Sequence, residues 1–450
     1  SVLAISNNNF LKLLNYLMFS EKVSILIEKC TIFDRKYTIF KCHLLFLMII
    51  HEFIENMESI EHKVLDYILS IETQEEDFQN LIKILEDQNV KTNQHDLKII
   101  LYLLDKISSY HHRTPNFFEK IEQILNFFKN EMIQYYSNFE IYEIFKENKR
   151  ILLFLIEAKI IKIDKSIYKE MITTKFKLFK YPEYFSPEIK QFIEEDLNKK
   201  QKKGLNTEIG ILYKKIDEIC NGDQKLFNEK RKNGENDGFI YKIIQNDSIE
   251  EFITYINKEN YSLKNCVEES IFETNPFLLN QKEISLIEYA AFFGSIQIFK
   301  YLYKNGVEQT PSLWIYAIHG ENEEMIHILE ENKIELIIDT QDEEIDFENE
   351  DIEPKTNNNV SYYNCLKESI KCHHNHIANY INDNFLNENN DNKISAAYCF
   401  QYYNFVCFPK EIKKYDDIFE FACKYDYFTI VKHLLDTQKI DINKSIKNKI

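Results

Sequence analysis

The chain has 450 residues, which is enough for two or three ordinary domains or for one long array of repeats. A net charge of −18 argues against binding to nucleic acid or to anionic lipid, because both need clustered Lys and Arg. The chain has only eight glycines and none before Gly204, which excludes a Walker A loop or a G-x-G-x-x-G fingerprint upstream and disfavours a fold rich in β-turns.

Cysteine usage indicates a reducing compartment. The nine cysteines are an odd number, and no two of them form a C-x-x-C pair. Most lie inside apolar helical patterns, which is typical of buried, reduced thiols rather than of a disulfide framework. We therefore expect an intracellular protein, cytoplasmic or nuclear.

Residues 1–56 are expected to form amphipathic helices. Their two apolar runs, 10–19 and 44–50, are shorter than the roughly 20 residues that a membrane-spanning helix needs, so we predict no stable membrane insertion. A signal peptide would need a basic start and a small-residue cleavage site, and neither is clear in this segment. Two alternatives stay open: that Met57 is the natural start, and that this segment associates with a membrane surface.

Residues 57–192 are predicted to form a helical domain. Apolar side chains recur there at helical spacing in successive short segments. Thr114 is the expected cap of one of these helices, with Pro115 in its first turn. The segments that carry the pattern are 60–69, 81–85, 97–107, 117–128, 140–145 and 150–158.

One stretch of this domain carries a resemblance. Residues 111–121 read H-H-R-T-P-N-F-F-E-K-I. The stretch resembles the domain of unknown function that precedes the repeats in a large ankyrin-repeat family expanded in protist genomes, which implies a family and no activity. His111 and His112 would suit acid–base or phosphate chemistry. Because no nucleophile with an orienting third group stands nearby in the sequence, we predict a capping or packing role for them.

Residues 193–238 are expected to be a charged linker. Their most basic run, 199–203, reads K-K-Q-K-K. In a chain of opposite net charge, such a run is typical of a solvated linker or helix end rather than of an RNA or membrane contact.

The clearest repeat unit is 285–306. Its opening, S-L-I-E-Y-A, stands where ankyrin repeats have T-P-L-H-x-A, so the unit resembles one ankyrin repeat. Gly294 is expected to turn the chain between two antiparallel helices with a positive φ, and Gly306 to end the second helix. The apolar positions that predict the two helices are Ile287, Ala290 and Ala291 in the first and Ile298, Phe299 and Leu302 in the second.

Degenerate copies of this unit give about five repeats over 239–450. Gly320 is expected to take the place of Gly294 in the next unit, His373 in a later one and Asp426 in the last. These copies extend the resemblance, which implies an all-α protein: a helical N-terminal domain followed by an ankyrin-repeat α-solenoid.

Two further expectations concern the C-terminal half. The insertion 339–353 holds nine Asp or Glu and no Lys or Arg, which predicts a disordered acidic loop. The array reaches Ile450 without a polar capping repeat, so we expect the natural protein to continue beyond it.

The ankyrin resemblance implies a non-enzymatic scaffold that binds a protein partner, without a cofactor. In such arrays, residues at the start of the first helix and just before the turn face the concave groove, where rigid aromatics are typical anchors. For each of these residues the alternative is packing within the array. The candidates are Phe292, Phe293, Trp314, Ile318, His319, Lys371, Cys372, Lys424 and Tyr425.

The competing hypothesis is a metal-dependent or enzymatic regulator that acts through the N-terminal helical domain. Cys372 and His376, four residues apart, are the best candidate pair of metal ligands. The repeat pattern places them across a turn and no second pair has a matching spacing, so we predict no metal site. His373 is expected to stand in for glycine there, with its ring partly exposed.

Overall fold

The computed structural model describes residues 35–70, 75–199, 208–334, 336, 360–386, 391–409 and 415–432. The chain divides into two compact units, residues 1–53 with 429–450 and residues 54–428. Helix α3 (Arg35–Leu69) begins in the first unit, and everything that follows concerns residues 54–428. The acidic loop predicted at 339–353, most of the basic run at 199–203 and the apolar run at 10–19 lie outside the described residues.

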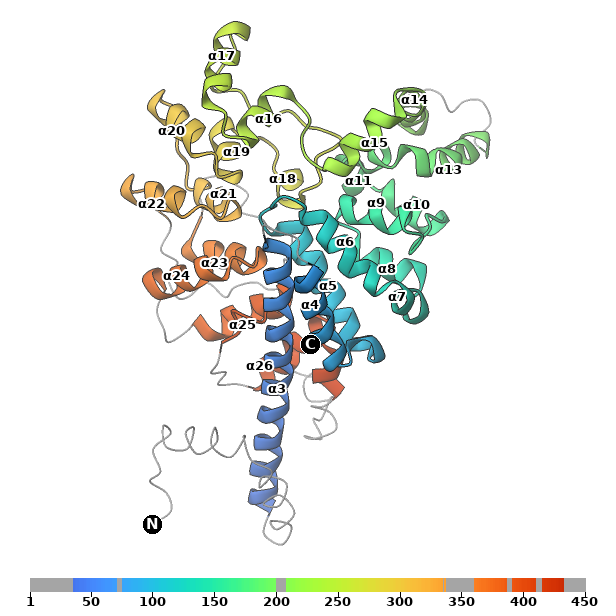
Figure 1. Cartoon of the computed structure of the whole chain (residues 1–450), viewed down its shortest axis with the longest axis vertical. Helices are drawn as coiled ribbons and strands as arrows, with labels where there is room; N and C mark the ends of the chain where they lie inside the picture. The colour runs from blue at the N-terminus through green and yellow to red at the C-terminus, as the bar shows by residue number, and fades with distance from the viewer. Residues whose placement is uncertain are drawn as a thin grey trace, which may run out of the picture. The chain divides into compact units, whose positions relative to one another are not determined.

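The described residues are helical and hold no β-strand, which confirms the all-α prediction (Figure 1). Within the described ranges, an antiparallel bridge joins Cys266 and Ser285. None of the helices in the described part combines the length and the apolar content needed to cross a bilayer.

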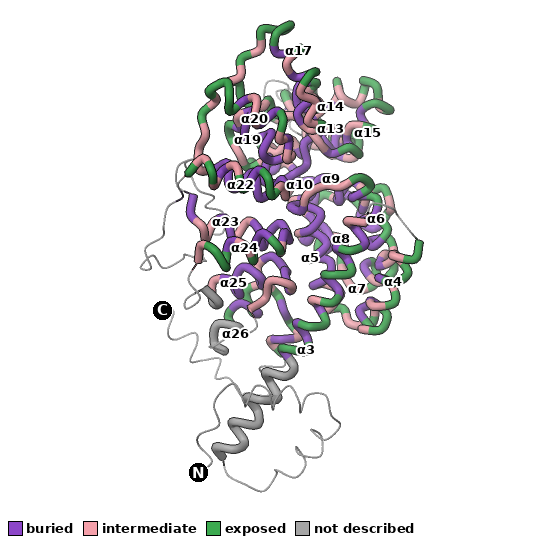
Figure 2. The backbone as a smooth tube through the Cα atoms, turned by 60° about the vertical axis from the view of Figure 1, so that its left-hand side comes forward, coloured by how far each residue is buried: buried purple, intermediate pink, exposed green. Residues whose placement is uncertain are grey.

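Helix α5 (Gln94–Tyr110) is buried along most of its length. Figure 2 shows this helix in the interior of the unit. Asn93 caps α5, because its side chain accepts from the backbone N–H groups of His95 and Asp96. Of the helices that follow in the chain, α6 (Phe117–Phe127) and α8 (Asn138–Phe145) pack on α5. The other helices of this part are α4 (Glu75–Asp87), α7 (Lys129–Tyr135), α9 (Lys149–Glu157), α10 (Lys165–Met171), α11 (Thr174–Leu178) and α12 (Tyr181–Tyr184).

The predicted cap of α6 is wrong. Asn116, with φ of 60°, precedes the first helical residue Phe117, while Pro115 lies outside the helix. Thr114 accepts the backbone N–H of Phe117 through its carbonyl, and its buried hydroxyl has no hydrogen-bond partner among the described residues.

The segment expected to be a charged linker is largely helical instead. It contains the end of α13 (Ser186–Lys199) and all of α14 (Glu208–Asn221) and α15 (Gln224–Asn233), and α13 packs on α14. Arg231 is buried and donates to both carboxylate oxygens of Glu188, at 3.0 and 2.9 Å. The charged composition therefore marks the outer faces of helices that have a buried side.

The C-terminal half repeats one arrangement of paired helices. The first helices pack on one another in chain order, and in Figure 1 they lie toward α5, with the second helices outside them. The short α18 (Pro276–Asn280) packs on α5. The pairs are α16 (Phe239–Gln245) with α17 (Ile249–Glu259), α19 (Leu286–Phe292) with α20 (Ile296–Lys304), α21 (Leu313–His319) with α22 (Glu323–Glu331), and α23 (Tyr362–Lys371) with α24 (Asn375–Phe385), followed by α25 (Asp391–Tyr402) and α26 (Tyr415–Lys424).

Each turn between the helices of a pair holds one left-handed residue, two positions after the first helix ends, such as Asp247 after α16. The turn after α25 has Tyr403 in this conformation, one position after the helix ends. The predictions for Gly294, His373 and Asp426 are confirmed, with φ of 64°, 57° and 62°. In the α21–α22 turn the left-handed residue is Glu321, with φ of 48°, and not the predicted Gly320, whose φ is −73°. Gly320 has a different role, since a Cβ there would lie 2.4 Å from the carbonyl oxygen of Ala291 in the preceding pair.

A ladder of hydrogen bonds joins successive turns. In four of them, a side chain donates a hydrogen bond to a backbone carbonyl of the preceding turn. The donor is the residue that follows the left-handed position of its own turn. The acceptor lies three residues before the left-handed position of the preceding turn. The residue types differ, so the ladder has no simple sequence motif. The bonds run from Ser295 to Ile244 (2.5 Å), His374 to Ile318 (2.7 Å), Asn404 to Ile370 (3.0 Å) and Tyr427 to Phe400 (2.9 Å).

The close approach at Gly320 can be tested by substitution. We expect Gly320→Ala to lower the free energy of unfolding by about 1–3 kcal/mol, because the added methyl meets backbone that cannot move away. Gly222→Ala is the control, since its Cβ would make only ordinary contacts at 3.4 Å and no positive φ is involved. Urea unfolding of both variants provides the comparison. Equal stability of the two variants would contradict the packing described for Gly320.

Candidate functional site

Helix α5 and the residues after it lie along the turns of the helix pairs. Lys98 pairs with Asp426, the ring of Tyr102 stacks on Tyr403 at 4.9 Å, and Lys371 lies 4.4 Å from the ring centroid of Tyr110. Each of these contacts engages a different turn. The N-terminal helices therefore cover the face where the turns are stacked (Figures 1 and 2).

A buried acidic side chain from α3 joins the same face. The Glu61 carboxylate accepts from Nδ1 of His373 at 2.8 Å and from the backbone N–H groups of Phe405 and Val406 at 2.6 and 3.2 Å. Nε2 of His373 contacts the carbonyl oxygen of Tyr402 at 3.1 Å. Neither side chain is exposed, so each depends on the other to satisfy its polar atoms, and the partial exposure predicted for the His373 ring is wrong.

This packing decides where the predicted partner-binding residues lie. Six of them are buried, Lys424 is exposed, and Phe293 and Tyr425 are half-buried. Trp314 packs edge-on against Tyr362 and donates to the carbonyl oxygen of Ile334. The buried residues are Phe292, Trp314, Ile318, His319, Lys371 and Cys372.

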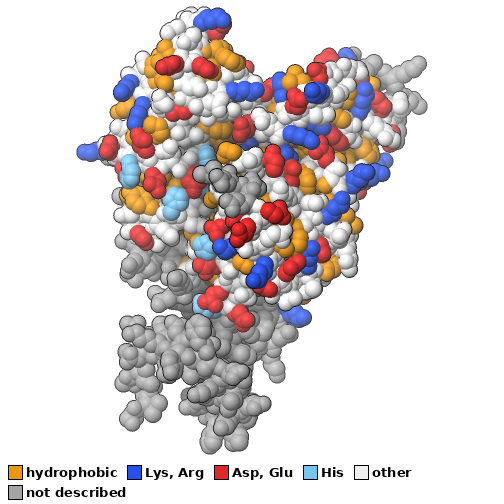
Figure 3. Space-filling model, in the orientation of Figure 1, with side chains coloured by type: hydrophobic (Ala, Val, Ile, Leu, Met, Phe, Trp, Pro, Cys, Tyr) orange, Lys and Arg blue, Asp and Glu red, His pale blue; other side chains and the backbone are white. Residues whose placement is uncertain are grey.

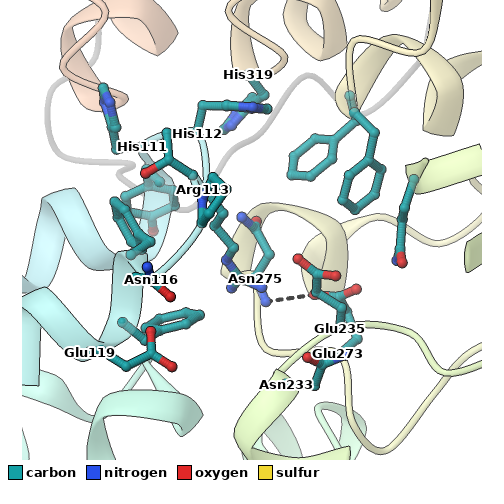
Figure 4. A pocket seen from close by; sticks show the side chains of 18 of the residues that line it. His111, His112, Arg113, Asn116, Glu119, Asn233, Glu235, Glu273, Asn275 and His319 are labelled. Atoms are coloured by element: carbon teal, nitrogen blue, oxygen red, sulfur yellow. Dashed lines mark hydrogen bonds between the residues drawn. The ribbon is translucent and has the colours of Figure 1, made fainter. Parts of the chain in front are cut away.

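A cavity of about 480 Å³ opens between the two halves of this unit (Figure 4). One wall is the loop 110–119, and another is the segment that follows α15. In Figure 4 Asn116 and Glu119 lie on the loop side, and Glu235 and Glu273 lie on the opposite side of the space. Of the predicted partner-binding residues, the cavity brings together Phe292, Phe293 and His319.

Arg113 holds the loop wall in place. Its guanidinium donates to the carbonyl oxygen of Gly234 at 2.9 Å and to the hydroxyl of Thr274 at 3.0 Å, and it lies 4.8 Å from the ring centroid of Phe118. The pKa of Glu235 is raised, because the effect of burial exceeds the opposing effect of the Arg113 charge. The H-H-R stretch is thus a structural wall of the cavity. The sequence pattern singled out this stretch, but it did not predict that Glu235 and Glu273 would line the same cavity.

Two histidines converge beside this wall. Nδ1 of His111 contacts the carbonyl oxygen of Cys372 at 2.7 Å, and Nδ1 of His374 contacts that of Ile318 at 2.7 Å. Since a carbonyl can only accept, both rings carry their proton on Nδ1, and both Nε2 atoms are acceptors. Burial lowers the pKa of His111 to about 3 and that of His374 well below its usual value, so both rings are neutral at neutral pH.

A carboxylate completes the group. One carboxylate oxygen of Glu321 lies 3.7 Å from Nε2 of His374. Burial together with the charge of Glu323 raises the pKa of Glu321 to about 7. One ligand atom from each of His111, Glu321 and His374 lies within 4.8 Å of the other two.

A second group consists of Cys372, His319 and Glu368. The sulfur lies 3.3 Å from Nδ1 of His319, whose Nε2 lies 3.0 Å from Glu368. The order thiol, imidazole and carboxylate resembles that of a nucleophilic triad. However, Cys372 is fully buried, and burial together with the charge of Glu368 raises the pKa of its thiol well above the usual value. The thiol is therefore protonated and inaccessible, which favours a structural role.

The structure separates Cys372 and His376, the pair that the sequence offered as metal-ligand candidates before we predicted no metal site there. Cys372 belongs to the group with His319, whereas His376 is exposed beside Glu321 and Glu323, at 3.9 and 4.0 Å. The spacing in the sequence grouped residues that lie on opposite sides of the turn, and missed His111, which comes from the other half of the unit.

Comparison with protein-family models, with curated proteins and with solved structures finds no match for this chain. The ankyrin resemblance therefore depends on the residues quoted above.

Glu368 gives the protein a predicted sensitivity to acid. Burial alone would raise its pKa, but Lys371 and His319 lower it from 4.5 to about 2. Its ionised form thus contributes on the order of 3 kcal/mol of stability above pH 4.5, and this contribution is lost as the pH falls toward 2.

We therefore expect Glu368→Gln to be less stable than the unchanged protein at pH 7, with a difference that narrows below pH 4.5. Urea unfolding at several pH values measures it. Glu324→Gln, at an exposed ion pair with Lys300, serves as the control and should show little difference at any pH. A deficit of Glu368→Gln that stays constant across this range would contradict the assignment.

Proposed function

We propose that the chain is a non-enzymatic scaffold of the ankyrin-repeat type that binds a protein partner. Support for the repeat class comes from the shared turn geometry, the ladder of hydrogen bonds and the residues of 285–306. The N-terminal helices act as a fixed cover for the turn face of the array. Fold alone does not identify a partner, so the proposal depends on the site.

The observation that carries the proposal is the cavity between the two halves. It is lined by charged and amide side chains together with the rings of Phe292 and Phe293. Aromatic side chains set among polar groups are typical of the centre of a binding interface. Because Phe293 is only half-buried, its ring is the anchor that a partner segment would contact.

The charge of the protein disfavours nucleic acid as a partner. The net charge is −18, and on the face shown in Figure 3 acidic and basic side chains are interspersed without a continuous patch of either sign. Such a surface does not suit the phosphate backbone of a nucleic acid, which needs clustered cations. We propose a protein segment inside the cell as the ligand.

A non-enzymatic role is favoured over the regulator with an active N-terminal domain. The arrangement closest to a catalytic triad holds a protonated and buried thiol. The histidine pair at 111–112 serves the wall of the cavity and the neighbouring turn.

The test uses the whole chain as bait, because α5 covers the turns and the repeats alone would expose that face. Proteins captured from a lysate are identified, and the strongest candidate is purified and titrated against the unchanged protein, Phe293→Ala and Phe239→Ala. The control residue, Phe239, is 64% exposed and lies outside the cavity.

We expect Phe293→Ala to weaken binding about tenfold or more, as truncation of an interface anchor does, and Phe239→Ala to leave it unchanged. Thermal unfolding must show that both variants are folded. A partner that binds both variants with unchanged affinity would place the interface elsewhere.

A further inference from the structure

The group at residues 111, 321 and 374 has the features of a metal site. Nε2 of His111 is buried and has no hydrogen-bond partner among the described residues. Leaving a buried polar atom unpaired is costly, so such an atom calls for an explanation. The rings of His111 and His374 lie edge to face with 4.7 Å between their centroids. One ligand atom from each of His111, His374 and Glu321 lies within 4.8 Å of the other two.

The surroundings of the two rings match those of metal-ligating histidines. Such histidines usually donate the N–H of one ring nitrogen to a carbonyl or carboxylate, which fixes the tautomer and turns the lone pair of the other nitrogen toward the metal. His111 and His374 both do this through Nδ1. Both rings thus have the tautomer that ligation through Nε2 requires.

We propose that His111, Glu321 and His374 bind one zinc ion or a similar divalent transition metal ion. Two imidazoles and one carboxylate suit such ions better than magnesium or calcium, which prefer oxygen ligands. Zinc bonds of about 2.0–2.2 Å place ligand atoms roughly 3.4 Å apart, so the group contracts slightly on binding. Glu321 is half-buried, so its side chain is the member of the group that we expect to move on binding.

Two neighbouring contacts bear on the coordination. The backbone N–H of His112 approaches Nε2 of His374 at 3.3 Å, a long contact that the metal bond replaces. His376 lies 3.9 Å from the other oxygen of Glu321 and is exposed. It is therefore available as a fourth ligand, and water fills the position otherwise.

The second group, around Cys372, is a poorer metal site. Its atoms already satisfy one another, with the thiol facing Nδ1 of His319 and the opposite ring nitrogen facing Glu368.

The site would connect the two halves of the unit. His111 follows α5, whereas Glu321 and His374 lie in successive turns of the helix pairs. A bound ion would therefore hold the covering helix on the repeats and add to the stability of the folded state. This inference is independent of any protein partner.

The experiment measures zinc binding to the full chain after chelator treatment. Equilibrium dialysis gives the amount of zinc bound, and thermal unfolding with and without zinc gives the stabilisation. We expect about one zinc per chain and a melting temperature that rises until the site is filled. His374→Ala and Glu321→Gln should bind zinc at least about tenfold more weakly and lose most of the temperature shift.

Matched variants separate the site from its surroundings. His327→Ala removes an exposed histidine on α22 and should bind zinc as the unchanged protein does. Cys372→Ser should keep the binding, since the second group is not the site. If His374→Ala does not fold, Glu321→Gln, which alters a half-buried side chain, provides the result.

Three outcomes would overturn the proposal: no zinc uptake by the unchanged protein, equal binding by Glu321→Gln and His327→Ala, or a loss of binding confined to Cys372→Ser. Binding by Cys372→Ser together with loss in Glu321→Gln would support it.

Discussion

The buried pair of Glu61 and His373 is the contact on which the arrangement of residues 54–428 depends. One carboxylate satisfies an imidazole nitrogen and two backbone N–H groups, all in the interior. Removing the Glu61 carboxylate would leave these buried donors without a hydrogen-bond partner, and each such donor lowers the stability of the folded state. His373 also adopts the left-handed conformation of its turn, so a single residue sets the turn and anchors the covering helices.

This constraint explains why the partner-binding residues predicted from the sequence are mostly internal. The turn face of the helix pairs is in contact with α5, so Ile318 and Lys371 pack inside the protein. What remains accessible between the halves is the cavity beside the loop 110–119. The proposed metal site uses His111 from the same loop, so ion binding would fix the wall against which a partner would lie.

Local patterns predicted the helices and most of the turns. Gly294, His373 and Asp426 all lie where the alignment of the repeat units placed the left-handed residue. Gly320 was misplaced because a glycine can serve either a positive φ or a close backbone approach, and the sequence does not distinguish the two. The charged segment 193–238 was taken for a linker because its many Lys and Glu concealed a buried side that includes Arg231.

The site could not be predicted in the same way. Its contacts join residues far apart in the chain, such as Glu61 with His373 and His111 with His374. A histidine or aromatic residue at a turn carries the same local signal whether it packs inside or contacts a partner. Only the position of α5 decides between these roles, and that position follows from polar pairs that no spacing in the sequence reveals.

The central claim is that the N-terminal helices and the helix pairs of residues 54–428 form one cooperative unit joined along α5. Hydrogen exchange of the intact chain, measured by mass spectrometry, tests it most directly in Glu61→Ala and in the control Glu324→Ala, whose ion pair is exposed. We predict that in Glu61→Ala the peptides from α5 and from the turns near residues 373 and 403 lose protection together, while the control is unchanged. Retained protection in α5 while the turns open would contradict the account.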